Sequence, residues 1–184
     1  PELGPRAGYV VTCVFGMPDD NFKRLSFIDV VEALGASPQP TILAMEQRFP
    51  PEIAAKEGLA GEIMTTAMQA VGCVGVVSNG PSRDIDAIRP LGFQYLLSGV
   101  SAGHGDFAVQ AVNVLVSIAG MDVAPGEIVH MDENGACKFP ADQLENVLTN
   151  VRVLLADEDM RLAQMRSAKS TEDVLAVLGN STKK

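Results

Sequence analysis

The chain has 184 residues, of which 47% are hydrophobic and 20% are charged, a composition that predicts a folded domain with a sizeable core. Acidic residues number 23 against 14 basic ones, and the resulting net charge of −9 argues against direct binding to nucleic acid. No run of about 18 apolar residues indicates a membrane span, and the first residues lack the pattern of a signal peptide. We therefore expect a cytoplasmic protein. Because the chain starts at Pro1 and not at Met, we also expect the gene product to extend upstream.

The first third of the sequence predicts strands that alternate with helices. Residues 9–15 form a β-branched and aromatic run that is typical of a buried strand. Asn21 is a suitable cap for a helix that ends at Gly35. The buried face of this helix is expected to consist of Phe22, Leu25, Ile28, Val31 and Leu34. Residues 41–45 predict a short strand, and the proline-broken segment 47–58 predicts a loop or an irregular turn.

The clearest helix covers residues 60–71. Its apolar residues recur at helical spacing, and they are Ala60, Ile63, Met64, Ala67, Met68 and Val71. Residues 73–77 follow as a predicted buried strand. A turn through residues 79–81 then leads into a short helix that starts at Arg83 and Asp84.

The second half of the sequence predicts hairpins. A strand over residues 95–97 precedes them, and from residue 108 onward the predicted strands cover residues 109–116, 128–132 and 136–139. Two of the turns among them, Ala119-Gly120 and Asn134-Gly135, have residues typical of tight hairpins. The three cysteines, Cys13, Cys73 and Cys137, lie in strand-like apolar segments without the spacing of a metal site, so we predict buried free thiols in a reducing compartment.

Two helices are predicted near the end of the chain. Pro140 opens the longer one, whose apolar residues are Leu144, Val147, Leu148, Val151 and Leu154. The last helix has Ser170 as its cap, Asp173 three residues further on, and Gly179 past its end. We predict a single domain over residues 1–184, in which residues 141–184 form a C-terminal helical segment. The mixed order of elements predicts a layered α/β domain and not a regular doubly wound sheet.

Arg83 and Asp84 are the most informative residues for function. A guanidinium matches a carboxylate through two parallel hydrogen bonds, and a carboxylate is a ligand that a hard cation such as Mg²⁺ prefers. At a turn that enters a helix, Asp84 is also a suitable cap, and Arg83 suits a surface ion pair. From the dipeptide alone, this structural interpretation is favoured.

Glu62 adds a second carboxylate. Twenty residues lie between Glu62 and Arg83, which lets the chain go out along a helix and return along a strand, so the charged groups are expected at one end of the sheet. Glu62 lies off the apolar stripe of its helix, and this also fits a solvated first-turn residue. The backbone N–H groups of Gly61, Glu62 and Ile63 suit an anion site, and Gly61 is explained if the backbone approaches a ligand closely.

The two histidines are weaker candidates. His104 lies between glycines and suits a mobile acid or base, although an exposed loop histidine is the favoured interpretation. His130 lies in a predicted strand and is expected to be structural, and Asp132 and Glu133 are explained by their hairpin turn. The sequence contains no dinucleotide-binding glycine loop, no phosphate-binding loop and no serine–histidine–aspartate pattern.

Taken together, these residues resemble a known family. The run GEIMTTAMQAVGCVGVVSNGPSRDIDAIRPLGF is similar to the core motif of the RraA-like family, an acidic residue followed after twenty residues by Arg-Asp, which here are Glu62, Arg83 and Asp84. The similarity continues through VNVLVSIAGMDVAPGEIVHMDENGACKFP and covers most of the chain. The family includes the regulator of ribonuclease E activity and the class II 4-hydroxy-4-methyl-2-oxoglutarate / 4-carboxy-4-hydroxy-2-oxoadipate aldolases.

The resemblance implies a swivelling β/β/α layered domain that assembles as a homotrimer or homohexamer, with active sites between subunits. It implies that Asp84 binds Mg²⁺ or Mn²⁺ and that Arg83 holds the 2-oxo acid and its developing enolate. Glu62 stands where the family usually has Asp, and it would position the proton-transfer water. The amides of Gly61, Glu62 and Ile63 would hold the pyruvoyl carboxylate. The family's N-terminal helix has no counterpart in this sequence, so we expect the chain to lack it.

The resemblance therefore predicts an enzyme. We expect a divalent-metal-dependent lyase that cleaves or decarboxylates a small 2-oxo di- or tricarboxylic acid, such as 4-hydroxy-4-methyl-2-oxoglutarate or oxaloacetate, and releases pyruvate. The divalent ion would act as a Lewis acid on the enolate. The alternative is a non-catalytic regulator that inhibits a ribonuclease by protein contact, since the family's regulators resemble the aldolases at the same positions.

Overall fold

The structure is a computed structural model that describes residues 2–21 and 25–179. The chain divides into two compact units, residues 1–141 and residues 142–184, and each is described by itself. The predicted single domain over residues 1–184 stays a prediction. Within the described ranges, no helix combines the length and the apolar character that a membrane span requires.

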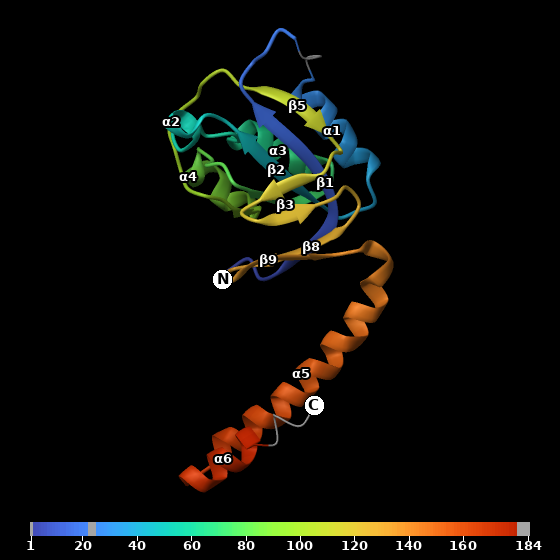
Figure 1. Ribbon diagram of the computed structural model, residues 1–184, viewed down its shortest axis with the longest axis vertical. Coiled ribbons are helices and arrows are strands. Elements are labelled where there is room, and N and C mark those ends of the chain that lie inside the picture. Colours follow the sequence, from blue (N-terminus) through green and yellow to red (C-terminus); the bar gives the residue numbers. More distant parts are fainter. Residues whose placement is uncertain (1, 22–24, 180–184) are drawn as a thin grey trace. The chain divides into compact units, whose positions relative to one another are not determined.

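A mixed sheet forms the centre of the first unit (Figure 1). In spatial order, its strands are β4 (Gln94–Leu96), β3 (Cys73–Ser78), β2 (Thr41–Arg48), β1 (Arg6–Gly16), β8 (Ile128–Asp132) and β9 (Gly135–Phe139), and β5 (Ala108–Val112) also pairs with β1. The strands from β4 to β1 are parallel, whereas β5, β8 and β9 pair in antiparallel fashion. A separate antiparallel hairpin consists of β6 (Val116–Ile118) and β7 (Met121–Val123).

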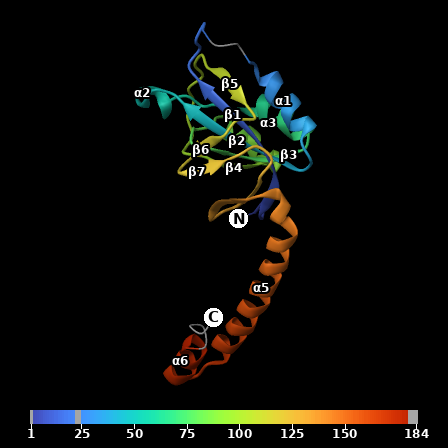
Figure 2. The ribbon, with the colours of Figure 1, turned by 45° about the vertical axis from the view of Figure 1, so that its right-hand side comes forward.

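Alternation along β1 explains why both faces of the sheet are covered. The helices of this unit are α1 (Phe27–Ala36), α2 (Pro51–Ala54), α3 (Glu62–Ala70), α4 (Ile85–Ile88) and the 3₁₀ turn η1 (Arg89–Leu91). Val11, Cys13 and Phe15 pack in one core cluster with residues of α1 and α3. Val10 and Val14 point to the other face and pack with residues of the β6–β7 hairpin. Figure 2 shows this hairpin beside the sheet. The result is a hairpin, sheet and helix layering, which confirms the predicted layered α/β class.

The predicted start of the first helix at Asn21 is wrong, and α1 begins at Phe27. Ser26 caps it: its Oγ accepts a hydrogen bond from the Ile28 amide at 3.2 Å, and Asp29 returns one by accepting from the Ser26 amide at 2.7 Å. This reciprocal capping box satisfies two otherwise unpaired amides. Asn21 instead donates to Asp19 in a local turn. Phe22, predicted on the buried face, lies outside the described residues.

The predicted strand over residues 109–116 is two strands. β5 ends at Val112 because Asn113 adopts a left-handed backbone with a φ of 55°. The amide of Asn113 donates to the carbonyl oxygen of Thr12 at 2.8 Å, and the chain then leaves the main sheet for β6. Asparagine is among the few residues that tolerate this conformation, which hydrophobic periodicity does not reveal.

Two smaller expectations also need correction. The segment 47–58, predicted as a loop, contains the end of β2 and the helical turn α2, in which Pro51 occupies the first position, where proline fits. Cys13 and Cys73 are buried and free as predicted, and burial raises the pKa of both thiols. Cys137 is exposed, contrary to the prediction, because it lies on β9 at the edge of the sheet.

The second unit consists of two helices, α5 (Leu144–Ser167) and α6 (Thr171–Gly179), and the 3₁₀ turn η2 (Ala141–Gln143) precedes α5. The predicted cap of the last helix is confirmed, since Ser170 Oγ accepts from the Asp173 amide and Asp173 Oδ2 accepts from the Ser170 amide, both at 3.1 Å. In its described residues, neither helix buries a side chain.

Glu46 on β2 ties the hairpin layer to the sheet. Its carboxylate accepts hydrogen bonds from Arg48 at 2.9 and 3.0 Å and from the amide of Ser117, in the middle of β6, at 3.2 Å. The Glu46 side chain is 13% exposed. The hydrogen bond from Arg48, with help from the Ser117 amide, lowers the pKa of the Glu46 carboxyl below its ordinary value.

Replacing Glu46 with Gln tests this contact through its pH dependence. Because the folded-state pKa is lowered, the carboxylate contributes stability above about pH 4.3, the ordinary glutamate value, and loses it as the pH falls further. We expect Glu46→Gln to reduce the free energy of unfolding by about 1 kcal/mol at pH 7, and the loss to shrink steadily below about pH 4.3. Urea denaturation over this range measures the difference, with the exposed Glu32→Gln on α1 as the control. A loss that does not change with pH would contradict the account.

Candidate active site

The end of β3 and the start of α3 come together at one end of the sheet, where the sequence places the charged residues. Asn79, just after β3, accepts from the Gln47 amide at 2.6 Å and donates to the Gln47 carbonyl oxygen at 3.0 Å. These two bonds fix the chain as it leaves the sheet for Arg83. The predicted meeting of Glu62 with Arg83 and Asp84 is present in the structure.

Backbone hydrogen bonds hold residues 58–61 alongside residues 81–83. The Leu59 amide donates to the Pro81 carbonyl oxygen at 2.9 Å, and the Arg83 amide donates to the Ala60 carbonyl oxygen at 3.0 Å. Ser82 is fully buried, and its hydroxyl donates to the same Ala60 oxygen at 2.6 Å. These hydrogen bonds fix the position of the segment that carries Arg83 against residues 58–61.

Asp84 has the most unusual backbone in the site. Its φ of 59° and ψ of 36° lie in the left-handed region, which is uncommon for any residue but glycine. Its carbonyl oxygen accepts from the Ala87 and Ile88 amides at 3.0 and 2.9 Å, so the backbone begins α4. Its side chain makes no cap bond to α4 and instead accepts from the Glu62 amide at 3.1 Å through Oδ2. The Asp84 side chain therefore caps the first turn of α3.

Gly61 makes this contact possible. A Cβ atom at residue 61 would overlap Oδ2 of Asp84 and come within 3.0 Å of Nε of Arg83. We predicted that Gly61 allows a ligand to approach the backbone closely. In the structure, the group that approaches the backbone is the Asp84 carboxylate. The amide of Glu62, predicted to hold a substrate carboxylate, already donates to this aspartate.

Arg83 is anchored at one end of its guanidinium. Its Nη1 donates to the Gly58 carbonyl oxygen at 2.5 Å, and its Nε lies 3.9 Å from Oδ2 of Asp84. The Arg83 side chain is 16% exposed and that of Asp84 is 46% exposed. A guanidinium fixed in this way presents its remaining N–H groups in a defined direction.

Thr65 and Tyr95 support the start of α3, and sequence reasoning did not single them out. The Thr65 hydroxyl donates to the Gly61 carbonyl oxygen at 2.8 Å and lies 2.7 Å from the Tyr95 hydroxyl on β4. Burial raises the pKa of Tyr95 to about 12, so the phenol stays protonated at neutral pH. Thr65 lies outside the predicted apolar stripe of this helix, although the structure buries it fully. Nothing in the spacing pairs it with a tyrosine thirty residues away.

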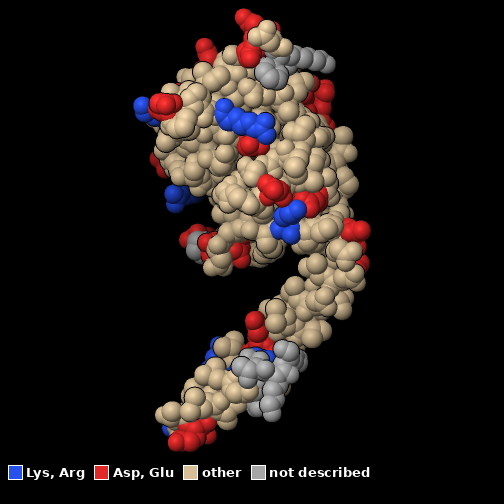
Figure 3. All heavy atoms as spheres, viewed as in Figure 1, with Lys and Arg blue, Asp and Glu red and all other residues tan. Residues whose placement is uncertain are grey.

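The charged residues line an open cavity of 590 Å³. Its lining includes Glu62, Arg83, Asp84, Asp86, Val100 and Ser101. Ile63 follows the lining residue Glu62 in the chain and is 87% exposed. The histidines lie apart from it: His104 is exposed in a loop, and His130 is half-buried on β8. On the face shown in Figure 3, basic side chains are few and separate, which agrees with the negative net charge.

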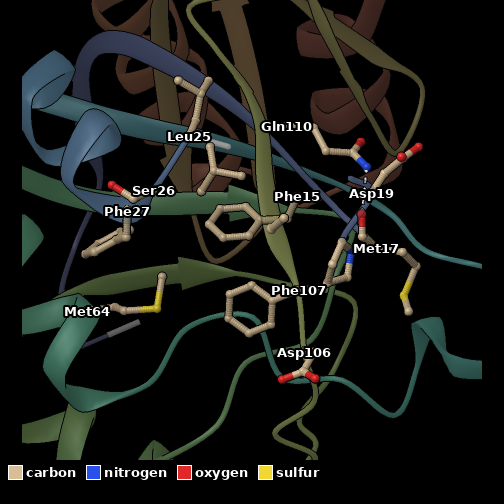
Figure 4. Close-up of a pocket in the computed structure, with 13 residues that line it drawn as sticks. Phe15, Met17, Asp19, Leu25, Ser26, Phe27, Met64, Asp106, Phe107 and Gln110 are labelled. Carbon is tan, nitrogen blue, oxygen red and sulfur yellow. Dashed lines mark hydrogen bonds between the residues drawn. The ribbon is translucent and has the colours of Figure 1, made fainter. Parts of the chain in front are cut away.

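A second cavity of 410 Å³ lies between α1, α3 and the segment before β5 (Figure 4). Its lining is mainly apolar and includes Phe15, Leu25, Phe27, Met64 and Phe107. The rings of Phe15 and Phe107 meet edge to face with centroids 5.4 Å apart. None of the predicted site residues lines this cavity, so the polar cavity remains the candidate active site.

The fold and the site define a layered α/β domain that carries a carboxylate and a guanidinium at the end of a parallel strand. The sequence model of the RraA-like family, described as Aldolase/RraA, matches residues 2–137, and the chain belongs to this family. The resemblance drawn from Glu62, Arg83 and Asp84 is thereby confirmed.

Two curated relatives match part of the chain. A Halalkalibacterium halodurans protein, named as a candidate 4-hydroxy-4-methyl-2-oxoglutarate aldolase, is 30% identical over 104 residues, which are 56% of this chain and 50% of that protein. Protein DlpA of Legionella pneumophila is 27% identical over 106 residues, which are 56% of this chain and 17% of that protein. The chain thus spans about half the length of the first relative and less than a fifth of the second.

Solved structures share the fold. An uncharacterized Pseudomonas syringae pv. tomato protein has a TM-score of 0.71 at 20% identity, with 91% of this chain and 76% of that chain covered. Streptomyces coelicolor RraAS2, described as an unusual member of the RNase ES inhibitor RraA protein family, has a TM-score of 0.69 at 21% identity, with coverage of 88% and 78%. At these identities the likeness establishes the RraA-like fold.

Gly61→Ala tests the close approach of Asp84 to α3. The new methyl group has to displace the Asp84 carboxylate from the Glu62 amide, and we expect the free energy of unfolding to fall by about 1–3 kcal/mol. Gly99→Ala is the matched control, because a Cβ atom there meets nothing within 4 Å, and its effect is expected to stay within about 0.5 kcal/mol. Chemical denaturation measures both variants. Equal losses of unfolding free energy in the two variants would mean that the Asp84 contact does not require glycine at residue 61.

Proposed function

We propose that this protein is a divalent-metal-dependent lyase that acts on a small 2-oxo di- or tricarboxylic acid and releases pyruvate. The observation that carries the proposal is the Asp84 carboxylate held beside the anchored Arg83 guanidinium in one open cavity. Membership in a family described as Aldolase/RraA and the name of the Halalkalibacterium halodurans relative support it. Candidate substrates are 4-hydroxy-4-methyl-2-oxoglutarate, by retro-aldol cleavage, and oxaloacetate, by decarboxylation.

The charges of the cavity favour a cation. Glu62, Asp84 and Asp86 bring three carboxylates against the single guanidinium of Arg83 among the residues that line it. An anionic substrate would be repelled there unless a cation were also bound. Among the described residues there is no group of three or more His, Cys, Asp or Glu side chains arranged to hold a metal. Mg²⁺ and Mn²⁺ often use one or two carboxylates and take their other ligands from water and substrate, and Asp84 is proposed as the main protein ligand of such an ion.

Arg83 is proposed to bind the substrate. The N–H groups that do not bond to Gly58 suit a carboxylate or the 2-oxo oxygen, where negative charge develops as the carbon–carbon bond breaks. A divalent ion bound at Asp84 would supply Lewis-acid stabilisation of the same charge. The first-turn amides of Gly61 and Ile63, which helix geometry leaves without a partner in the helix, are suited to the other end of the pyruvoyl group.

Glu62 is proposed to assist proton transfer. In retro-aldol cleavage the 4-hydroxyl proton leaves, the bond between carbons 3 and 4 breaks, and its electron pair forms a pyruvate enolate that is then protonated at carbon 3. The exposed Glu62 carboxylate lines the cavity and can hold the water that accepts the first proton.

A further part of the proposal concerns assembly. Ile63 is 87% exposed and Val100 is 66% exposed beside the charged cavity, which suits a site that a neighbouring subunit covers. A homotrimer or homohexamer with active sites between subunits remains a prediction, as does a cytoplasmic location. The alternative function, a regulator that inhibits a ribonuclease by protein contact, shares the same fold and gives the opposite result in the assay below.

Pyruvate release from 4-hydroxy-4-methyl-2-oxoglutarate and from oxaloacetate, with Mg²⁺ or Mn²⁺ and with chelator, tests the function. We expect metal-dependent turnover that Asp84→Ala lowers at least about a hundredfold, because the ion then loses its protein carboxylate. Arg83→Lys keeps the charge but loses the planar fork, and we expect a higher KM together with a lower kcat.

Asp122→Ala, an exposed aspartate on β7, is the control and is expected to keep wild-type turnover. Absence of turnover by the wild type with either ion and both substrates would favour the regulator. Unchanged turnover in Asp84→Ala would exclude the proposed role of this residue.

A further inference from the structure

The long helix α5 carries an exposed apolar stripe. It has 24 residues and buries none of them. Five apolar residues follow one another at intervals of four, three, four and seven positions. They are Leu144, Leu148, Val151, Leu155 and Leu162. Each is between 37% and 53% exposed. α6 contacts α5 around Gln164 and Ser167, towards its C-terminal end, and leaves the stripe uncovered.

Such a repeat is the pattern of a helix that pairs with another helix. A seam with apolar residues every 3.5 positions on average forms a coiled coil, in which the residues on either side of the seam select the partner and its direction. An isolated helix with this much exposed apolar surface gains little stability alone, because most helical stability in proteins comes from packing an apolar face. The stripe therefore suits packing against a partner helix.

We propose that α5 pairs in antiparallel fashion with α5 of a second copy of this chain. The four charged residues along one edge of the stripe alternate in sign at seven-residue spacing, and they are Glu145, Arg152, Asp159 and Arg166. Among the described residues, none of these four forms an ion pair within its own chain. Their charges are therefore available to a partner.

An antiparallel pair matches all four charges. In such a pair, residues on the same edge of the seam face each other, so Arg152 lies opposite the partner's Asp159 and Glu145 lies opposite the partner's Arg166. Both pairs are centred on the same point, between residues 155 and 156. One two-fold axis through this point produces both pairs twice, which is the self-complementarity that an isologous interface requires.

A parallel pair does not use these charges. It would place Arg152 against the partner's Val147 and Asp159 against the partner's Leu154, and neither contact is an ion pair. The remaining position of the stripe is Glu158, and a single polar residue in a seam fixes register at a cost in stability. The charge pattern thus selects both the direction and a second copy as the partner. This inference does not depend on the proposed lyase activity.

Charge exchange in the full chain tests the pairing. Arg152→Glu and Asp159→Arg each place like charges opposite one another, and we expect each to raise the dissociation constant of the pairing at least about tenfold. The double variant restores opposite charges across the axis, and we expect its dissociation constant to return to within about threefold of the wild-type value. Within one helix the two residues are about 10 Å apart, so the rescue requires a second chain.

Sedimentation equilibrium over a range of concentrations measures the association, and circular dichroism confirms that each variant keeps its helices. Thr149→Glu, which lies away from the stripe and its charged edge, is the control and is expected to leave the assembly unchanged. Of the two predicted assemblies, the homohexamer fits this pairing and the homotrimer does not. A wild type that does not contain an even number of chains, or single variants that leave the mass unaltered, would overturn the proposal. A double variant as weak as the single variants would show that α5 pairs with something other than an antiparallel copy.

Discussion

The hydrogen bond from the Glu62 amide to the Asp84 carboxylate is the contact on which the candidate site depends. It joins the first turn of α3 to the turn after β3, although its partners are 22 positions apart in the sequence. Asp84 makes it from a left-handed backbone conformation, and Gly61 is the residue that leaves room for the carboxylate. The same contact keeps a negative charge beside the anchored Arg83. One hydrogen bond therefore sets both the position of the Asp84 carboxylate and the charge of the site.

The rest of the domain supplies a rigid frame for this contact. β1 lies at the centre of the sheet and packs on both faces, against α1 and α3 on one side and against the β6–β7 hairpin on the other. The parallel strands β2 and β3 end next to each other. The Asn79 side chain joins their ends through two hydrogen bonds to the backbone of Gln47. Tyr95 on β4 reaches α3 through Thr65, so the helix start is held from the sheet as well as from Asp84.

The sequence predicts the elements of the site better than the contacts within it. Periodicity places α3 and β3, and the Asn-Gly-Pro turn places Arg83 and Asp84 at the start of α4. The left-handed conformation of Asp84 and the link between Thr65 and Tyr95 arise from packing between distant segments, and no local pattern encodes them. The start of α1 was missed for a local reason, because the Ser26–Asp29 capping box outweighs Asn21.

Direct titration with Mn²⁺, followed by electron paramagnetic resonance, tests the central claim that Asp84 creates a cation site beside Arg83. The account predicts one Mn²⁺ bound per wild-type chain and an affinity at least about tenfold lower in Asp84→Asn, which keeps the shape of the side chain but removes its charge. Equal binding by the wild type and Asp84→Asn would contradict the claim.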